Sequence, residues 1–251
     1  MNPALKNRPI VSTAAFDFAA DAQRVLSNER ILARSRMEGE LIASLITEHR
    51  LGAYLDLGCW YGLLAREVLA RCTPGYTLLA DAGVPFLEIA RSTIAPHRAH
   101  FLHTAIVSAS ADIKDGRARL DVNTADTSSS AVRPCDAEGV TLDAPARTIV
   151  QLLGELPAQV VRDAYLKLDL EGLDEAVMRD LAASPFRPAF LHFEYLPREW
   201  SSPPPGCFEF IRAAGYQLPA MPPSGSHMYY SVICGKSAGA LVGFRPDVAY
   251  R

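Results

Sequence analysis

Short apolar segments alternate along the chain with segments of helical periodicity. Seven apolar segments have the length of strands, and they cover residues 53–57, 76–80, 100–107, 165–170, 190–196, 216–218 and 228–234. Helices are predicted between them, notably at 84–94, 142–156, 173–181 and 208–214. Strands that alternate with helices pair in parallel, with helices on both faces of the sheet. The pattern therefore predicts an α/β fold with a Rossmann-like, doubly wound, mostly parallel sheet of seven strands.

Two parts of the chain stand outside this alternation. Residues 16–50 are helical in character and Gly52 follows as a stop, so we assign residues 1–52 to an N-terminal helical extension. That extension is either a lid over a ligand or simple packing against the sheet. Residues 108–145 are polar and too long for a plain loop, which predicts an insertion within a single domain of residues 53–251.

Residues 53–69, with the sequence AYLDLGCWYGLLAREVL, predict a strand, a tight turn and a helix. Glycines in such a turn let the backbone approach a ligand, and the first N–H groups of the helix can receive a carboxylate or phosphate. A nucleotide-like ligand is therefore the first hypothesis. A dinucleotide-binding loop has a second glycine where this chain has Trp60, which argues against a pyrophosphate. The alternative is that Gly58 and Gly62 only shape the turn.

Acidic residues stand at the ends of several predicted strands. Asp81 follows the second strand, about twenty residues after the glycines, where a carboxylate can accept both hydroxyls of a ribose. Its alternative role is to cap the helix that begins at Val84. The small Ala105 in the third strand leaves room for a flat adenine ring. Ligands of such sheets bind at the carboxyl ends of the strands. Five residues are predicted at this edge: Asp56, Gly58, Asp81, Asp169 and Glu194.

Bulk composition narrows the classes of partner and compartment. Lysine and arginine (25) nearly balance aspartate and glutamate (28), and the net charge is -3. This balance does not indicate the basic surface that binds nucleic acid or an anionic membrane. The five cysteines are widely spread without a C-x-x-C pair, as in a reducing compartment. No apolar run reaches the roughly 18 residues of a membrane span, and no signal-peptide pattern is present. We predict a cytoplasmic protein whose oligomeric state the sequence leaves open.

Two motifs in order give the chain a family resemblance. LDLGCWYG at 55–62 follows the Asp-x-Gly-x-x-x-Gly pattern of motif I of class I S-adenosylmethionine (SAM) methyltransferases, and KLDLEGLD at 167–174 is similar to a K-I-D-x-E-G-x-E signature. With LLAD, HTAIVS, VTLDAPARTIVQLL and LHFEYL, these motifs resemble the FkbM-type SAM-dependent methyltransferases. The resemblance runs from about residue 53 to residue 234.

The resemblance implies transfer of a methyl group from SAM to a hydroxyl of a sugar or other small molecule of secondary metabolism, with S-adenosylhomocysteine as product. We expect cofactor-binding residues at Asp56, Gly58, Tyr61, Gly62, Asp81 and Ala105. A hydroxyl nucleophile needs a proton acceptor, and the candidate catalytic residues are Asp169, Glu171 and Glu194. Asp169 has anchoring of the cofactor as its alternative role, and Glu171 has capping of the following helix.

Several alternatives stay open at this point. Mg²⁺ is an unproven second cofactor, because Asp169 and Glu194 close adjacent predicted strands and Mg²⁺ prefers oxygen ligands. Within the methyltransferases, the acceptor atom is either oxygen or nitrogen. A non-catalytic SAM-binding protein is a further alternative. An NAD-dependent oxidoreductase is disfavoured by Trp60 and by the missing third glycine.

Overall fold

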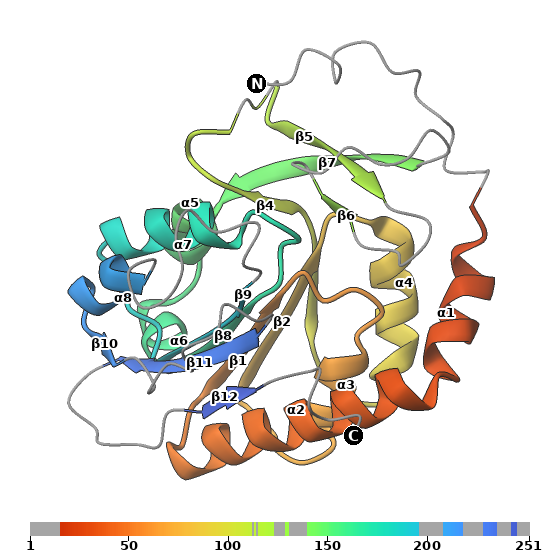
Figure 1. The fold of residues 1–251 in the computed structure, drawn as a ribbon, viewed down its shortest axis with the longest axis horizontal. Helices are drawn as coiled ribbons and strands as arrows, with labels where there is room; N and C mark the ends of the chain where they lie inside the picture. The colour runs from red at the N-terminus through yellow and green to blue at the C-terminus, as the bar shows by residue number, and fades with distance from the viewer. Residues whose placement is uncertain are drawn as a thin grey trace.

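A single mixed sheet forms the centre of the computed structural model, which describes residues 16–111, 113, 115–122, 129–130, 140–195, 208–217, 228–234 and 242–244. Its strands are β1 (Ala53–Leu57), β2 (Tyr76–Asp81), β3 (His100–His103), β8 (Ala164–Leu168), β9 (Phe190–Tyr195), β10 (Tyr216–Gln217) and β11 (Met228–Cys234). They lie in the order β10-β11-β9-β8-β1-β2-β3, and β12 (Val242–Phe244) pairs with β11 (Figure 1). Seven strands thus lie on the main path, with an eighth at its side.

The direction of the strands confirms the predicted doubly wound α/β fold. The neighbours β3, β2, β1, β8 and β9 are all parallel, whereas β11 runs antiparallel to β9. The first strand therefore lies in the middle, and the chain winds outward from it first to one side and then to the other. This reversal of strand order next to β1 creates the point at which ligands bind in open α/β sheets.

Helices cover both faces of this sheet. One face packs on α2 (Glu29–Glu48), α3 (Leu63–Leu69) and α4 (Val84–Thr93), with α1 (Phe18–Leu26) beside α4. The other face packs on α5 (Ile149–Glu155), α6 (Ala158–Arg162), α7 (Asp174–Ala183) and α8 (Glu209–Ala213). Successive side chains of β1 point to opposite faces of the sheet. Tyr54 packs against the helices of the first face, and Leu55 and Leu57 pack against those of the second. The long helix α2 runs beneath the sheet in Figure 1.

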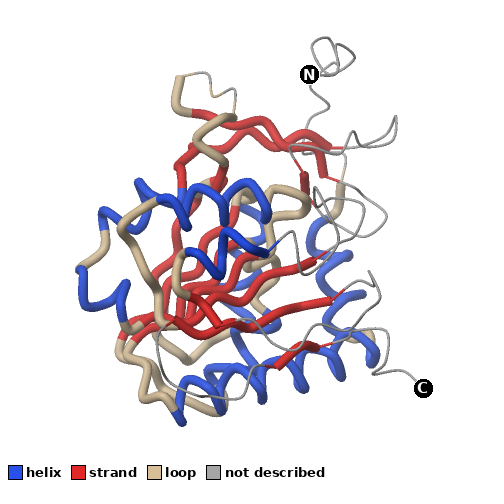
Figure 2. Tube along the Cα trace, turned by 60° about the vertical axis from the view of Figure 1, so that its left-hand side comes forward, coloured by secondary structure: helices blue, strands red, loops and turns tan. Residues whose placement is uncertain are grey.

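A second sheet, of four strands, lies above the carboxyl edge of the main one (Figure 2). It contains β4 (Ala105–Val107), β5 (Arg117–Val122), β6 (Ser129–Ser130) and β7 (Val140–Thr148), in the order β4-β7-β5-β6. The predicted insertion 108–145 supplies β5, β6 and the first part of β7. Residues 123–128 and 131–139 of that insertion lie outside the described residues, as do residues 1–15 of the N-terminal extension.

Two predicted elements are wrong at this second sheet. The predicted single strand 100–107 is divided, because the chain leaves the main sheet at Thr104, whose hydroxyl donates to the Pro145 carbonyl at 3.0 Å. The predicted helix 142–156 begins only at residue 149. Leu142 and Ala144 alternate as buried residues on β7, which pairs with the distant strand β5, so long-range pairing outweighs the local helical pattern.

Among the described residues, no helix combines the length and the apolar character that crossing a membrane requires.

Candidate functional site

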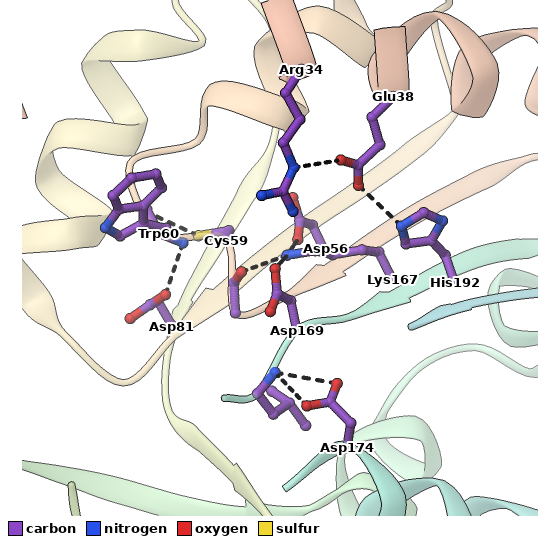
Figure 3. Close-up of polar contacts among 12 residues, drawn as sticks. Arg34, Glu38, Asp56, Cys59, Trp60, Asp81, Lys167, Asp169, Asp174 and His192 are labelled. Carbon is purple, nitrogen blue, oxygen red and sulfur yellow. Dashed lines mark hydrogen bonds and ion pairs between the residues drawn. The ribbon is translucent and has the colours of Figure 1, made fainter. Parts of the chain in front are cut away.

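A buried lysine joins the two central loops of the carboxyl edge. Lys167 on β8 is in register with Asp56 on β1, and its ammonium lies 3.1 Å from Asp56 Oδ1 and 3.5 Å from Asp169 Oδ2 (Figure 3). It also donates to the Gly58 carbonyl at 2.7 Å. We call Asp56, Gly58, Lys167 and Asp169 the lysine cluster. Because both acids and the glycine turn share one cation, their relative positions are fixed.

Burial and charge shift the pKa values within the lysine cluster. Burial opposes the charge of Lys167, but Asp56 and Asp169 outweigh that effect and raise its pKa. For Asp169, burial raises the pKa to about 6, with a contribution from the charge of Glu194, while Lys167 acts in the opposite direction. The Asp169 side chain keeps 24% of its surface exposed. Asp169 is therefore a partly accessible carboxylate that binds a proton more readily than an ordinary aspartate.

Asp81 at the end of β2 is held by backbone N–H groups instead of a cation. Its Oδ2 accepts from Trp60 at 2.9 Å and its Oδ1 accepts from Gly83 at 2.9 Å. Burial raises the pKa of Asp81 to about 6, although both hydrogen bonds favour the ionised form. A carboxylate has about four acceptor positions, so two bonds leave capacity for hydroxyl donors. The alternative role as a helix cap is wrong, because the N-cap of α4 is Gly83.

The two motif glycines have clear packing reasons. Gly58 has a φ of +81°, and a Cβ at this position would stand 1.9 Å from the Asp169 carbonyl oxygen. Gly62 has a φ of +72°, and its Cβ would stand 2.9 Å from the Ala90 Cβ. Both contacts are with other parts of the protein. They therefore agree with the alternative that Gly58 and Gly62 only shape the turn. The helix that follows, α3, has only seven residues and no side-chain cap.

Tyr61 faces the N-terminal helices. It is fully buried, and its hydroxyl donates to Asp21 Oδ2 on α1 at 2.8 Å. The ring centroids of Tyr61 and Phe86 lie 5.3 Å apart, as do those of Phe86 and Phe18. The Trp60 ring stacks on that of Tyr61, with 4.9 Å between the centroids. We call Phe18, Trp60, Tyr61 and Phe86 the aromatic cluster. This cluster connects the glycine turn to α1 and α4.

The remaining predicted residues lie in different surroundings. Ala105 belongs to β4 and packs in the apolar core of the second sheet, so it does not end a strand of the main sheet. Glu194 lies on β9 and is buried, with its charge acting on Asp169. Glu171 adopts a φ of +51°, a region that side chains rarely occupy. It does not cap α7, whose N-cap is Leu173, and the Leu170 N–H donates instead to Asp174 at 3.1 Å.

A second buried polar group was not predicted. His192 on β9 is in register with Lys167, and its Nε2 lies 3.0 Å from Glu38 Oε1 on α2. The Nδ1 of the same ring lies 3.1 Å from the Tyr165 hydroxyl. Burial raises the pKa of Glu38, but the hydrogen bond and charge of His192, together with the charges of Arg34 and Lys167, outweigh burial and lower the pKa. The available signal was a glutamate on the apolar side of a predicted helix.

The described residues contain no group of three or more His, Cys, Asp and Glu side chains placed to hold a metal ion. Asp169 and Glu194 act on one another electrostatically, and Lys167 already neutralises Asp169 from one side. A cation bound by Asp169 and Glu194 would have to compete with Lys167 for Asp169.

Comparisons with known proteins give matches to solved structures alone. No protein-family model matches the chain, and no curated protein matches it. Magnesium protoporphyrin IX methyltransferase (ChlM) from Synechocystis PCC 6803, solved with bound SAM, is 10% identical, with 89% of this chain and 100% of that chain covered and a TM-score of 0.41. DesVI from Streptomyces venezuelae is 11% identical, with 93% and 81% covered and a TM-score of 0.31.

A third structure is SAM-bound CalS10, an amino pentose methyltransferase from Micromonospora echinaspora involved in calicheamicin biosynthesis. It is 12% identical, with 95% of this chain and 82% of that chain covered and a TM-score of 0.31. Because all three TM-scores lie below 0.5, the fold assignment for this chain rests on its own strand order and strand directions.

Proposed function

We propose that this chain is a SAM-dependent methyltransferase that methylates a hydroxyl of a small metabolite or sugar. The observation that carries the proposal is the pairing of Asp81 with the glycine turn. Asp81 stands at the end of β2, and the backbone of the turn after β1 orients its carboxylate through Trp60. A carboxylate in this place suits the two hydroxyls of a ribose. Ribose binding by itself indicates only a nucleoside. The resemblance of the two motifs to those of FkbM-type methyltransferases supports SAM as that nucleoside.

The lysine cluster supplies the second part of the proposed reaction. SAM, when bound, supplies a methyl group on a positively charged sulfur. Asp169 is the group that we assign to accept the proton of the acceptor hydroxyl, because it is partly exposed and its pKa of about 6 lies close to neutral pH. Lys167 holds Asp169 against the glycine turn. Burial and, to a smaller extent, the charge of Glu194 keep the pKa of Asp169 raised, and Glu171 stays a candidate on the loop after β8.

The N-terminal helices divide into two roles in this proposal. Helix α2 is fixed to the sheet by the buried pair of Glu38 and His192. Helix α1 is attached to the glycine turn through the Tyr61 hydroxyl and aromatic rings. We therefore assign the lid function to α1 and a fixed structural function to α2. Residues 53–251 then form the catalytic domain, with the second sheet as an excursion from it.

Two alternatives keep specific support. An amine acceptor suits the same acidic edge, because a carboxylate beside the acceptor takes up a proton from nitrogen as well as from oxygen. A non-catalytic SAM-binding protein would share the binding residues but would not turn over any acceptor. The NAD-dependent oxidoreductase is disfavoured, since Trp60 places a large side chain where the pyrophosphate approaches the backbone.

Calorimetric titration with S-adenosylhomocysteine tests the proposal. We expect saturable binding by the wild type and about 10- to 100-fold weaker binding by Asp81→Asn, because the loss of a charged acceptor weakens hydrogen bonds by a few kcal/mol. Asp143→Asn is the matched control, since this exposed aspartate pairs with Arg117 in the second sheet. Absence of wild-type binding to both S-adenosylhomocysteine and SAM would refute the proposal, and binding of NADH would support the oxidoreductase.

Turnover is tested next with a panel of hydroxylated and amino sugars. We expect release of S-adenosylhomocysteine by the wild type. Asp169→Asn is the variant to compare, and its cofactor binding should be retained while its turnover falls by about 10²- to 10⁴-fold. Binding without turnover of any acceptor would favour the non-catalytic alternative.

A further inference from the structure

Trp60 is the residue of the glycine turn whose side chain the proposed reaction does not yet use. It has a φ of +49°, in the left-handed region that favours glycine. The turn also contains Gly58 and Gly62, both with positive φ, so glycine occupies two of its three left-handed positions. At the remaining position, Trp60, a residue with a Cβ and a large side chain makes this left-handed conformation unfavourable. We therefore expect contacts of the indole ring itself to offset this cost.

Hydrogen bonds fix the main chain of Trp60 at the end of β2. The Trp60 N–H donates to Asp81 Oδ2 at 2.9 Å, and the preceding Cys59 N–H donates to the Ala80 carbonyl at 3.1 Å. The turn is thereby bound to the end of β2. In Figure 3 the indole stands near the Asp81 carboxylate and apart from Lys167 and Asp169. A diol held by Asp81 would lie next to Trp60.

The ring itself is supported from behind. Tyr61 stacks on it with an interplanar angle of 29°, and Tyr61 is fully buried against Phe86. Trp60 is only partly buried. Tyr61 and Phe86 thus support one face of the indole beside Asp81.

We propose that the Trp60 indole packs against the nucleoside part of the cofactor whose ribose Asp81 binds. This inference rests on the proposed function and adds a cofactor-binding residue to it. In a loop with glycine at this position, the backbone alone meets the ligand. Here a flat aromatic surface replaces part of that contact, and aromatic stacking on a base accounts for about a tenfold gain in affinity or more.

Tryptophan emission reports this contact directly, because the chain has two tryptophans, Trp60 and Trp200. Trp200 lies outside the described residues, and Trp200→Phe removes its signal. In Trp200→Phe, we expect the emission of Trp60 to change saturably on titration with S-adenosylhomocysteine, at the dissociation constant found by calorimetry. 5′-Methylthioadenosine, which has the nucleoside without the amino acid, should give a similar change. An unchanged emission while calorimetry shows saturation would overturn the inference and leave the proposed function intact.

Two substitutions at Trp60 separate contact from folding. Trp60→Phe keeps an aromatic ring, and we expect its affinity for S-adenosylhomocysteine to stay within about threefold of the wild type. Trp60→Asn removes the ring but tolerates the left-handed backbone, and we expect about tenfold weaker binding with a thermal midpoint close to that of the wild type. Unchanged affinity of Trp60→Asn would show that the ring serves folding alone. Absence of binding by the wild type would instead refute the proposed function.

Discussion

The lysine cluster and the aromatic cluster lie on the same turn but are stabilised in opposite ways. The lysine cluster buries one cation among two carboxylates and a carbonyl group, with Lys167 only 5% exposed. The aromatic cluster joins rings from α1, α4 and the turn, and the Tyr61 hydroxyl donates to Asp21 on α1. The first joins strands of the sheet to one another, and the second joins the sheet to a peripheral helix. We infer that the lysine cluster is part of the rigid core, whereas the aromatic cluster can be separated from it.

Removal of the shared cation should have the largest effect. Lys167→Met removes the cation that the buried Asp56 and the partly buried Asp169 share, and we expect the free energy of unfolding to fall by about 3–5 kcal/mol in urea titrations at pH 7. Arg212→Met is the matched control, because Arg212 and Glu209 are each more than half exposed, and it should change stability by no more than about 0.5 kcal/mol. Similar losses in both variants would show that the lysine cluster is not part of the rigid core.

The pH dependence of stability tests Asp81, whose carboxylate accepts a hydrogen bond from the Trp60 N–H. Its pKa is raised to about 6 in the folded chain, so the folded state binds the proton more tightly than the unfolded state. The stabilisation is therefore complete below pH 4 and is lost as the pH rises to 6. A shift of about two units corresponds to about 3 kcal/mol.

Urea unfolding at pH 4, 5, 6 and 7 measures this effect. Burial also raises the pKa values of Asp169 and Asp174, so three carboxyl groups lower the stability of the wild type as the pH rises. In Asp81→Asn the loss between pH 4 and pH 7 should be smaller by about 2 kcal/mol, whereas Asp143→Asn should follow the wild type. Parallel curves for the wild type and Asp81→Asn would contradict the burial of an ionisable Asp81.

A comparison of two glycine substitutions distinguishes the cost of a steric clash from the cost of a left-handed backbone conformation. Gly58 and Gly116 both have positive φ, but a Cβ at Gly58 meets the Asp169 carbonyl, whereas a Cβ at Gly116 meets nothing within 4 Å. We expect Gly58→Ala to destabilise the chain by about 3 kcal/mol and Gly116→Ala by about 1 kcal/mol. Chemical unfolding of both variants measures the difference of about 2 kcal/mol. Equal losses would mean that the turn and the loop after β8 can move apart.

The sequence predicts the main sheet well because each strand has its own apolar run between breakers. The five residues predicted at the carboxyl edge do lie there, since parallel strands bring their ends together whatever the loops contain. The second sheet was not predicted, because β7 owes its conformation to pairing with β5 and not to its own pattern. The members of the buried pair, Glu38 and His192, are separated by 154 residues in the chain, so no local pattern joins them, although Glu38 lies on the apolar side of its predicted helix. Pairings of this kind depend on the packing of α2 on β9.

The smallest expected effect concerns the attachment of α1. Tyr61→Phe removes the hydrogen bond to Asp21, and we expect a loss of about 1 kcal/mol. Tyr54→Phe is the matched control, because the Tyr54 hydroxyl donates to Asp56 of the lysine cluster at 3.1 Å. If the two clusters are separable, amide hydrogen exchange in Tyr61→Phe should accelerate in α1 and stay unchanged in α2. Tyr54→Phe should leave the exchange of α1 at its wild-type rate. Faster exchange in both α1 and α2, in each of the two variants, would mean that the two helices open as one unit. The lid would then have to include both helices.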